Sequence, residues 1–217
     1  RMYLEILNEA NSFGAKVIAV SKTKPVEAIK AFYDKGQRLF GENKVQELCD
    51  KAAILPKDIE WHLIGHLQSN KVKYIAPFVS LIHAVDSEKL LEEINKQAIK
   101  NKRVIPCLLQ IHIAKEETKF GFSEEEVLDM LSTISFQSFS NIEIHGLMGM
   151  ATNTDNEDQV EQEFETLHKL FLSIKNNFFS NSPYFKELSM GMSSDYKLAL
   201  KHGATMIRVG SILFGER

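Results

Sequence analysis

The sequence has little of what marks several large protein classes. Its 217 residues contain only two cysteines, Cys49 and Cys107, so no disulfide framework or cysteine-based zinc site is readable. No apolar run approaches the ~20 residues of a membrane span, and residues 1–15 mix polar and apolar side chains, unlike a signal peptide. The 26 basic and 29 acidic side chains leave a net charge of −3, which argues against binding through many nucleic-acid phosphates. We therefore expect a cytoplasmic protein with two buried free thiols that binds neither nucleic acid nor a membrane.

The remaining composition is that of an ordinary globular protein. Hydrophobic residues make up 44% and charged residues 25% of the chain, so it can bury a substantial core. No stretch rich in proline, glycine and serine divides the chain, and no internal repeat is visible. At ~150 residues per domain, we expect residues 1–217 to form a single domain.

Eight short apolar runs alternate with helical patterns along the chain. Several are apolar at consecutive positions, which is typical of parallel strands buried on both faces. This alternation predicts an α/β protein with a single (β/α)8 TIM-type barrel. A doubly wound open sheet is the alternative, because alternation alone does not establish closure. The predicted strands are Val17–Val20, Arg38–Phe40, Glu60–Ile64, Leu81–Val85, Val104–Ile111, Ile142–Met148, Glu187–Ser189 and Met206–Val209.

The helical patterns carry recognisable start signals. Pro25 is placed as a first-turn proline and predicts a helix over Val26–Lys35. Ser123 and Glu126 form a capping-box pattern that predicts a helix over Glu124–Thr133. Further helices are predicted over residues 2–12, from Leu67–Lys71 onward, after Ser87, around Val160–Ile174, and over Asp195–His202 with Ser193 or Ser194 as cap.

Lys22 is the first candidate functional residue, because ligands of both folds bind beyond the carboxyl ends of the strands. In an extended strand Val20 and Lys22 point to the same side, so Lys22 continues an apolar face into the mouth of the barrel. Loss of hydration there lowers the pKa of a lysine, and a neutral amine is what Schiff-base chemistry requires. The alternative is an ordinary surface lysine at the start of a loop, and Lys24 lies nearby.

Two turns near the end of the chain suggest an anion site. After the seventh strand, Gly191 is flanked by Ser189 and Ser193 and leads into a helix, and after the eighth strand Gly210 is followed by Ser211. Backbone N–H groups in such turns favour a phosphate, and barrels often bind phosphate after strands seven and eight. Ordinary helix caps are the alternative for each turn taken separately.

Three other polar residues are either ambiguous in role or excluded as metal ligands. Asn43, after the second strand, either caps the next helix or faces a ligand. His62 and His66 have the spacing of a helical zinc pair, but Gly65 breaks a helix there and no HExxH motif or acidic third ligand is present. We therefore expect no metal site.

The motifs at the strand ends, taken together, resemble the pyridoxal phosphate homeostasis protein family, whose members are similar to the N-terminal domain of alanine racemase. The resemblance covers nearly the whole chain, and the motifs occur in family order. They are Ala19-Val20-Ser21-Lys22-Thr23-Lys24-Pro25, Phe40-Gly41-Glu42-Asn43-Lys44-Val45-Gln46-Glu47, Trp61-His62-Leu63-Ile64-Gly65 with Leu67-Gln68-Ser69-Asn70-Lys71, Leu188-Ser189-Met190-Gly191-Met192-Ser193-Ser194-Asp195, and Arg208-Val209-Gly210-Ser211 with Phe214-Gly215.

The resemblance implies a cofactor and the residues that hold it. The cofactor is pyridoxal 5′-phosphate (PLP), carried as an internal aldimine on Lys22. Asn43 is implied to lie near the cofactor ring and Arg208 to face the pyridine nitrogen. The residues implied to lie at the phosphate are Ser189, Met192, Ser193, Gly210 and Ser211.

An arginine at the pyridine nitrogen bears on whether the cofactor does chemistry. A guanidinium accepts no proton, so the ring stays unprotonated and is a weak electron sink. The resemblance implies that racemases of similar barrel type tolerate this arginine but add a tyrosine base from a second domain. We expect this chain to have no residues that could form such a domain. Tyr196 is a candidate from within the barrel, but nothing in the sequence places it opposite Lys22.

These considerations favour a non-catalytic protein that buffers or delivers PLP, acting as a monomer with PLP-dependent apoenzymes as partners. One alternative is a PLP-dependent racemase-type enzyme that works as a single-domain barrel. Another is a phosphate-binding barrel enzyme without PLP. Lys24, Lys71 and Lys119 stay open as secondary PLP acceptors.

Overall fold

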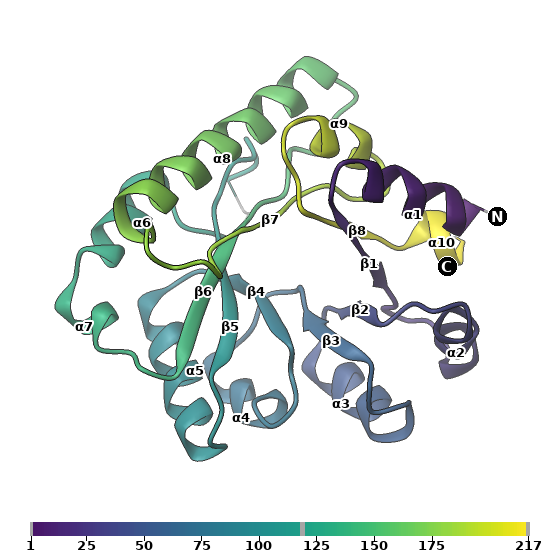
Figure 1. The fold of residues 1–217 in the computed structure, drawn as a ribbon, viewed down its shortest axis with the longest axis horizontal. Helices are drawn as coiled ribbons and strands as arrows, with labels where there is room; N and C mark the ends of the chain where they lie inside the picture. The colour runs from purple at the N-terminus through teal and green to yellow at the C-terminus, as the bar shows by residue number, and fades with distance from the viewer. Residues whose placement is uncertain (1, 118–119, 216–217) are drawn as a thin grey trace.

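The computed structural model describes residues 2–117 and 120–215 and contains a closed barrel of eight parallel strands (Figure 1). The strands follow one another in chain order around the barrel, and β1 pairs with β8 from Lys16 opposite Met206 to Ala19 opposite Val209. This pairing decides between the closed barrel and the open sheet. The strands are β1 (Lys16–Val20), β2 (Leu39–Glu42), β3 (Glu60–Leu63), β4 (Leu81–Val85), β5 (Ile105–Gln110), β6 (Ile142–Met148), β7 (Glu187–Ser189) and β8 (Met206–Val209).

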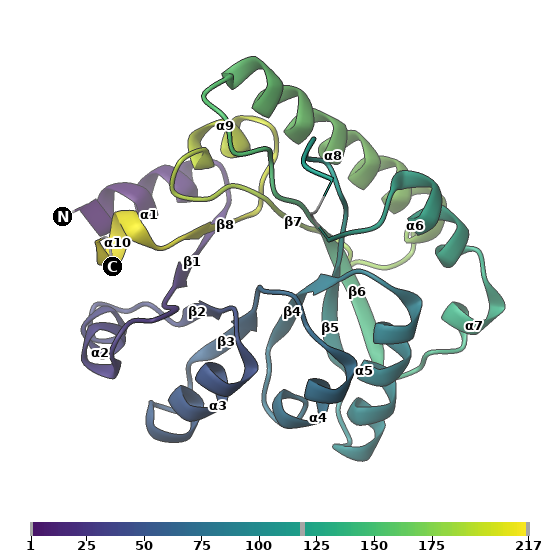
Figure 2. The ribbon, with the colours of Figure 1, turned by 180° about the vertical axis from the view of Figure 1, so that it is seen from behind.

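All eight predicted strands are confirmed, with ends that differ by no more than two residues. Helices surround them on the outside of the barrel, as both views show (Figures 1 and 2). The helices are α1 (Met2–Ser12), α2 (Val26–Asp34), α3 (Val45–Ile54), the 3-10 turn η1 (Ser69–Lys71), α4 (Val72–Ile75), α5 (Glu88–Lys100), α6 (Glu124–Leu131), α7 (Ile134–Gln137), α8 (Glu157–Phe178), α9 (Tyr196–Lys201) and α10 (Ser211–Phe214). Among the described residues, no helix is both long and apolar enough to cross a membrane.

The structure confirms some of the predicted helix caps and not others. Ser123 and Glu126 form the predicted capping box at the start of α6. This helix ends at Leu131, before the predicted end, because Thr133 accepts a hydrogen bond from the Phe136 N–H and caps α7. The prediction that Ser193 or Ser194 caps α9 is wrong, since Asp195 occupies the cap position there.

The last helix, α10, has only four residues, and α1 lies against it. Figure 1 shows the two helices side by side next to β1 and β8. Tyr196, in α9, also ties α1 in place, because its hydroxyl donates to Oε1 of Glu9 at 3.1 Å. The helix before the first strand thus packs against β1 and α10 and covers this flank of the barrel.

The core has two layers, as a barrel requires. The larger lies between the sheet and the helices, and a smaller one fills the inside of the barrel. Both cysteines are free, but only Cys107 is buried, so the prediction of two buried thiols is wrong for the partly exposed Cys49. The inner layer consists of Ile18, Leu81, Ala84, Leu108, Met148 and Met206.

Candidate cofactor site

Two hollows at the carboxyl ends of the strands share Lys22 in their walls. We call the first, of about 440 Å³, the apolar hollow, because most of its lining surface is carbon. The second, of about 310 Å³, is the polar hollow. The apolar hollow is lined by Val20, Lys22, Asn43, Lys44, Ile64, Gly65, His66, Gln110, Phe120, Met150, Met192 and Arg208. The polar hollow is lined by Val20, Lys22, Thr23, Lys24, Gly210, Ser211 and Gly215.

Lys22 lies where the strand alternation predicts. It follows β1 by two residues, and Val20, on the same side of the extended chain, lines the same two hollows. Its side chain therefore stands at the junction between an apolar space and a space rich in hydrogen-bond donors.

Arg208 supplies a buried cation to the apolar hollow. Only 3% of this β8 residue is exposed, and its guanidinium donates from Nη1 to Oγ of Ser189 at 2.5 Å and from Nη2 to the Gly149 carbonyl at 3.2 Å. Burial lowers the pKa of Arg208 to about 10, an effect that the Asp195 carboxylate opposes. The group is therefore still protonated at neutral pH, and it presents only donors to a ligand.

A chain of buried polar side chains continues from Arg208 into the barrel. Ser189 Oγ lies 3.0 Å from Nδ1 of His83, and Nε2 of His83 lies 2.9 Å from Nδ1 of His62. Burial lowers the pKa of His62 to about 3, with Lys16 adding to the effect. Burial also holds the pKa of His83 well below its usual value, with His62 and Arg208 contributing. Both rings are therefore neutral hydrogen-bonding groups at physiological pH.

His62 belongs to this row of hydrogen-bonded side chains, but His66 does not. Whereas His62 points to His83, His66 pairs with Asp86 at 3.4 Å and stacks on Phe120 with ring centroids 3.9 Å apart. Within residues 2–117 and 120–215, no group of three His, Cys, Asp or Glu side chains could hold a metal ion. The stacked His66 and Phe120 instead form part of the wall of the apolar hollow.

The polar hollow is built by the two serine-bearing turns. The N–H of Gly210 donates to Oγ of Ser193 at 3.3 Å, which ties the turn after β7 to the turn after β8. A side chain at position 210 would place its Cβ 3.1 Å from the Val20 carbonyl oxygen and 3.2 Å from Cβ of Val20. A larger residue at position 210 would require Val20 to shift by a few tenths of an ångström, so glycine favours the close approach of this turn to β1 beside Lys22.

The predicted site residues fall into three groups. Lys22, Asn43, Met192 and Arg208 line the apolar hollow, whereas Gly210 and Ser211, together with Lys22, line the polar one. Ser193 lines neither hollow but bonds Gly210, and Ser189 is fully buried with its hydroxyl on Arg208 and His83. Asn43 is not the cap of α3, because that helix begins at Val45 with Lys44 before it.

The chain is similar to a family of known proteins over nearly its whole length. Residues 3–217 match the model of the family described as alanine racemase, N-terminal domain. A "Pyridoxal phosphate homeostasis protein" of Aquifex aeolicus is 39% identical over 204 residues, covering 94% of this chain and 87% of the relative. One of Helicobacter pylori is 41% identical over 203 residues, with coverage of 93% and 87%. The chain belongs to the pyridoxal phosphate homeostasis protein family.

Solved structures agree with this assignment of the family. PipY of Synechococcus elongatus PCC7942 without PLP is 34% identical with a TM-score of 0.87, covering 97% of this chain and all of PipY. PipY with PLP bound is 35% identical with a TM-score of 0.84 at the same coverage. Alanine racemase of Bartonella henselae, with covalently bound pyridoxal phosphate, is 15% identical with a TM-score of 0.71, and only 59% of its chain is covered. At that identity the racemase shows the fold alone.

Sequence reasoning did not identify several residues that lie in or next to the two hollows. No sequence motif marks His83, Gln110 or Phe120. The stacking of His66 on Phe120 could not be read from the sequence either. His83 lies in a strand that reads as apolar core, and its partners are 21 and 106 residues away in sequence. Only the closed barrel brings them together.

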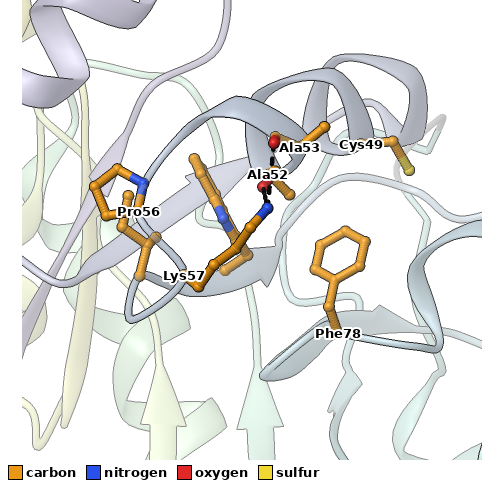
Figure 3. Close-up of a pocket in the computed structure, with 8 residues that line it drawn as sticks. Cys49, Ala52, Ala53, Pro56, Lys57 and Phe78 are labelled. Carbon is orange, nitrogen blue, oxygen red and sulfur yellow. Dashed lines mark hydrogen bonds between the residues drawn. The ribbon is translucent and has the colours of Figure 1, made fainter.

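A third hollow, of about 300 Å³, lies at α3 and β3 and shares no residue with the other two (Figure 3). It is mostly apolar, with Trp61 and Phe78 in its wall. Lys57 does not offer a free amine there, since Nζ donates to the carbonyl oxygens of Ala52 at 2.8 Å and Ala53 at 3.2 Å at the end of α3, as Figure 3 shows. This hollow is therefore not part of the candidate cofactor site.

Proposed function

We propose that the protein binds pyridoxal 5′-phosphate through a reversible Schiff base on Lys22 and contributes to PLP homeostasis by holding and releasing the cofactor. The observation that carries the proposal is the position of Lys22 in the walls of both hollows. PLP has an aldehyde on an apolar ring and a phosphate on a short arm, so it needs an amine between an apolar and an anion-binding space. PipY, a relative at 35% identity, is described with PLP bound.

The residues around Lys22 fit the parts of this cofactor. The apolar hollow would take the ring, with Asn43 and Met192 in its wall and Arg208 facing the pyridine nitrogen. The polar hollow would take the phosphate, with the Ser211 hydroxyl and the Gly210 turn as donors and Ser193 holding that turn. Ser189 would act through Arg208, because its hydroxyl faces that guanidinium.

The same residues favour a carrier over an enzyme. When bound, PLP stabilises negative charge on an attached carbon, and this is strongest when the pyridine nitrogen is protonated. Arg208 accepts no proton and is held in place by Ser189 and Gly149, so it would keep that nitrogen unprotonated. Tyr196 is not available as a base, because its hydroxyl donates to Glu9 and burial raises its pKa to about 12.

The proposal extends to the location, the oligomeric state and the partners of the protein. We propose that the protein acts in the cytoplasm as a monomer and passes PLP to PLP-dependent apoenzymes. The curated relatives are named homeostasis proteins, which supports this reading over a racemase-type activity.

The test is to mix the protein with PLP, reduce the adduct with borohydride and locate it by peptide mass mapping. We expect one modified residue, Lys22, and loss of the adduct in Lys22→Ala but not in Lys71→Ala. An adduct only on Lys24, on Lys71 or on Lys119, which lies outside the described residues, would contradict the assignment of Lys22. No adduct at all would favour a phosphate-binding barrel without PLP.

The enzyme alternative needs a separate measurement. Exchange of the Cα hydrogen of common amino acids for deuterium would reveal a racemase-type activity. We expect no exchange above that of free PLP. Exchange that Lys22→Ala abolishes would overturn the carrier proposal.

A further inference from the structure

A buried ionic cluster lies behind Lys22, outside both hollows. Nζ of Lys51, in α3, lies 2.8 Å from Oε2 of Glu42, in β2, and 2.7 Å from Oε2 of Glu47, also in α3. The side chains of Lys51 and Glu42 are 8% and 0% exposed, and that of Glu47 is 25% exposed. Burying the charged side chains of Lys51 and Glu42 is costly even when they pair, so a cluster away from the ligand space needs a reason.

The cluster bonds the residues on both sides of Lys22. Before it, Nζ of Lys51 donates to the Ser21 carbonyl oxygen at 2.7 Å, and Oγ of Ser21 donates to Oε2 of Glu42 at 2.5 Å. After it, the Thr23 N–H donates to Oε2 of Glu47 at 2.6 Å. The chain that carries Lys22 is thus held at residues 21 and 23, and Lys22 projects from between them.

The backbone conformation of Thr23 explains why the residues around Lys22 need these hydrogen bonds. Its φ of 61° lies in the left-handed region, which a β-branched residue rarely adopts. Such a conformation persists only where the surroundings impose it. The Thr23 N–H donates to Oε2 of Glu47, and the Lys24 N–H donates to the Ser21 carbonyl oxygen at 3.0 Å, so both hydrogen bonds hold the turn just after Lys22.

The charge state of Glu47 suits this role. Burial acts to raise the pKa of Glu47, but hydrogen bonds from Lys51 and from the Thr23 N–H outweigh it and lower the pKa overall. Glu47 is therefore a carboxylate at neutral pH and a strong acceptor for the backbone N–H.

We propose that Glu47 and Lys51 are positioning residues for Lys22: they set the turn that holds its amine at the junction of the two hollows before a ligand arrives. The inference rests on the proposed function, because it concerns how Lys22 meets an aldehyde. A group that is already in place loses less conformational freedom on binding, so the cluster contributes to affinity without touching the ligand.

Glu47 offers the cleanest variants, since it is the most exposed member of the cluster. Glu47→Ala removes the acceptor for the Thr23 N–H, whereas Glu47→Gln keeps an oxygen there. We expect Glu47→Ala to weaken PLP binding about tenfold and to slow adduct formation on Lys22, and Glu47→Gln to recover most of the loss. Gln46→Ala is the matched control, because Gln46 is an exposed neighbour in α3 whose side-chain amide donates to Oδ1 of Asp50 at 3.0 Å.

A second variant separates positioning from general stability. Glycine adopts a positive φ without strain, so Thr23→Gly lowers the cost of the turn itself. Because Thr23 also lines the polar hollow, the matched comparison is Glu47→Ala/Thr23→Ala, which lacks the same hydroxyl. We expect Glu47→Ala/Thr23→Gly to bind PLP more tightly than Glu47→Ala/Thr23→Ala, although a glycine does not restore the lost hydrogen bond.

The readouts are the dissociation constant for PLP, the rate of adduct formation and the urea midpoint of each variant. The proposal is overturned if the wild-type protein forms the Lys22 adduct and Glu47→Ala forms it with equal rate and affinity. It is also overturned if, at unchanged urea midpoints, Glu47→Gln binds PLP no more tightly than Glu47→Ala and Glu47→Ala/Thr23→Gly binds it no more tightly than Glu47→Ala/Thr23→Ala. Failure of the wild-type protein itself to form the adduct would instead refute the proposed function on which the inference rests.

Discussion

The Ser189 hydroxyl lies 3.0 Å from Nδ1 of His83, although the two residues are 106 positions apart in the chain. Because Arg208 also donates to this hydroxyl, the contact joins the cation of the apolar hollow to the neutral histidines inside the barrel. The orientation of Arg208 thus depends on Ser189 and His83, which line neither hollow.

This chain of hydrogen bonds predicts strong coupling between the two histidines. His83→Leu leaves Nδ1 of His62 buried without its partner, and such a group costs about 1–3 kcal/mol. Replacing both rings by leucine removes both polar partners, so the double variant should lose less stability than the sum of the single variants. Urea unfolding of the three variants measures this difference, and additive losses would contradict the coupling.

The same histidines predict how stability depends on pH. Burial lowers the pKa of His62 to about 3 in the folded protein, against about 6.5 for an exposed histidine. The unfolded chain therefore binds a proton that the folded chain does not, and stability falls as the pH drops from about 6.5 towards about 3. At pH 5 the loss from His62 is about 2 kcal/mol, and that from His83 has the same sign.

The measurement is the free energy of unfolding at pH 7 and at pH 5. His62→Gln keeps a hydrogen-bonding side chain but does not titrate, so it should show a smaller difference between the two pH values. Burial raises the pKa of Glu42, a shift that stabilises the fold at low pH and partly offsets the histidines. An unchanged pH dependence in His62→Gln would contradict the assignment.

The polar hollow predicts a selective effect on phosphate binding. Ser211→Ala removes a hydroxyl from its wall and should weaken PLP binding about tenfold, as expected for a hydrogen bond to a charged group. Pyridoxal, which lacks the phosphate, should bind the variant and the wild-type protein equally well. The comparison of the two ligands is the control, and an equal loss for both would place the phosphate elsewhere.

The two thiols should differ in reactivity. Cys107 is fully buried and burial raises its pKa strongly, whereas Cys49 is partly exposed, with a pKa also raised by burial. A thiol reagent at mild alkaline pH should therefore modify one cysteine in the native protein and the second only after unfolding. Cys49→Ser should abolish the native reaction, and modification of Cys107 in the folded variant would contradict the prediction.

How much could be read from the chain depends on how local each signal is. The eight strands, the capping box of Ser123 and Glu126, and the position of Lys22 after β1 follow from apolar runs and nearest neighbours, which any chain with this sequence presents. The serine-bearing turns are similarly local, because a glycine between polar residues acts within a few positions.

Closure of the barrel and the roles of the buried polar residues belong to the tertiary structure. The pairing of β1 with β8, the hydrogen bond of His83 to Ser189, and the hold of Glu47 on Thr23 join residues that are far apart in sequence. Periodicity says which side of a strand a residue occupies but not which distant group it meets there. Those partners are set by how the strands and helices pack, and so the sequence alone located Lys22 while the fold decided what surrounds and orients it.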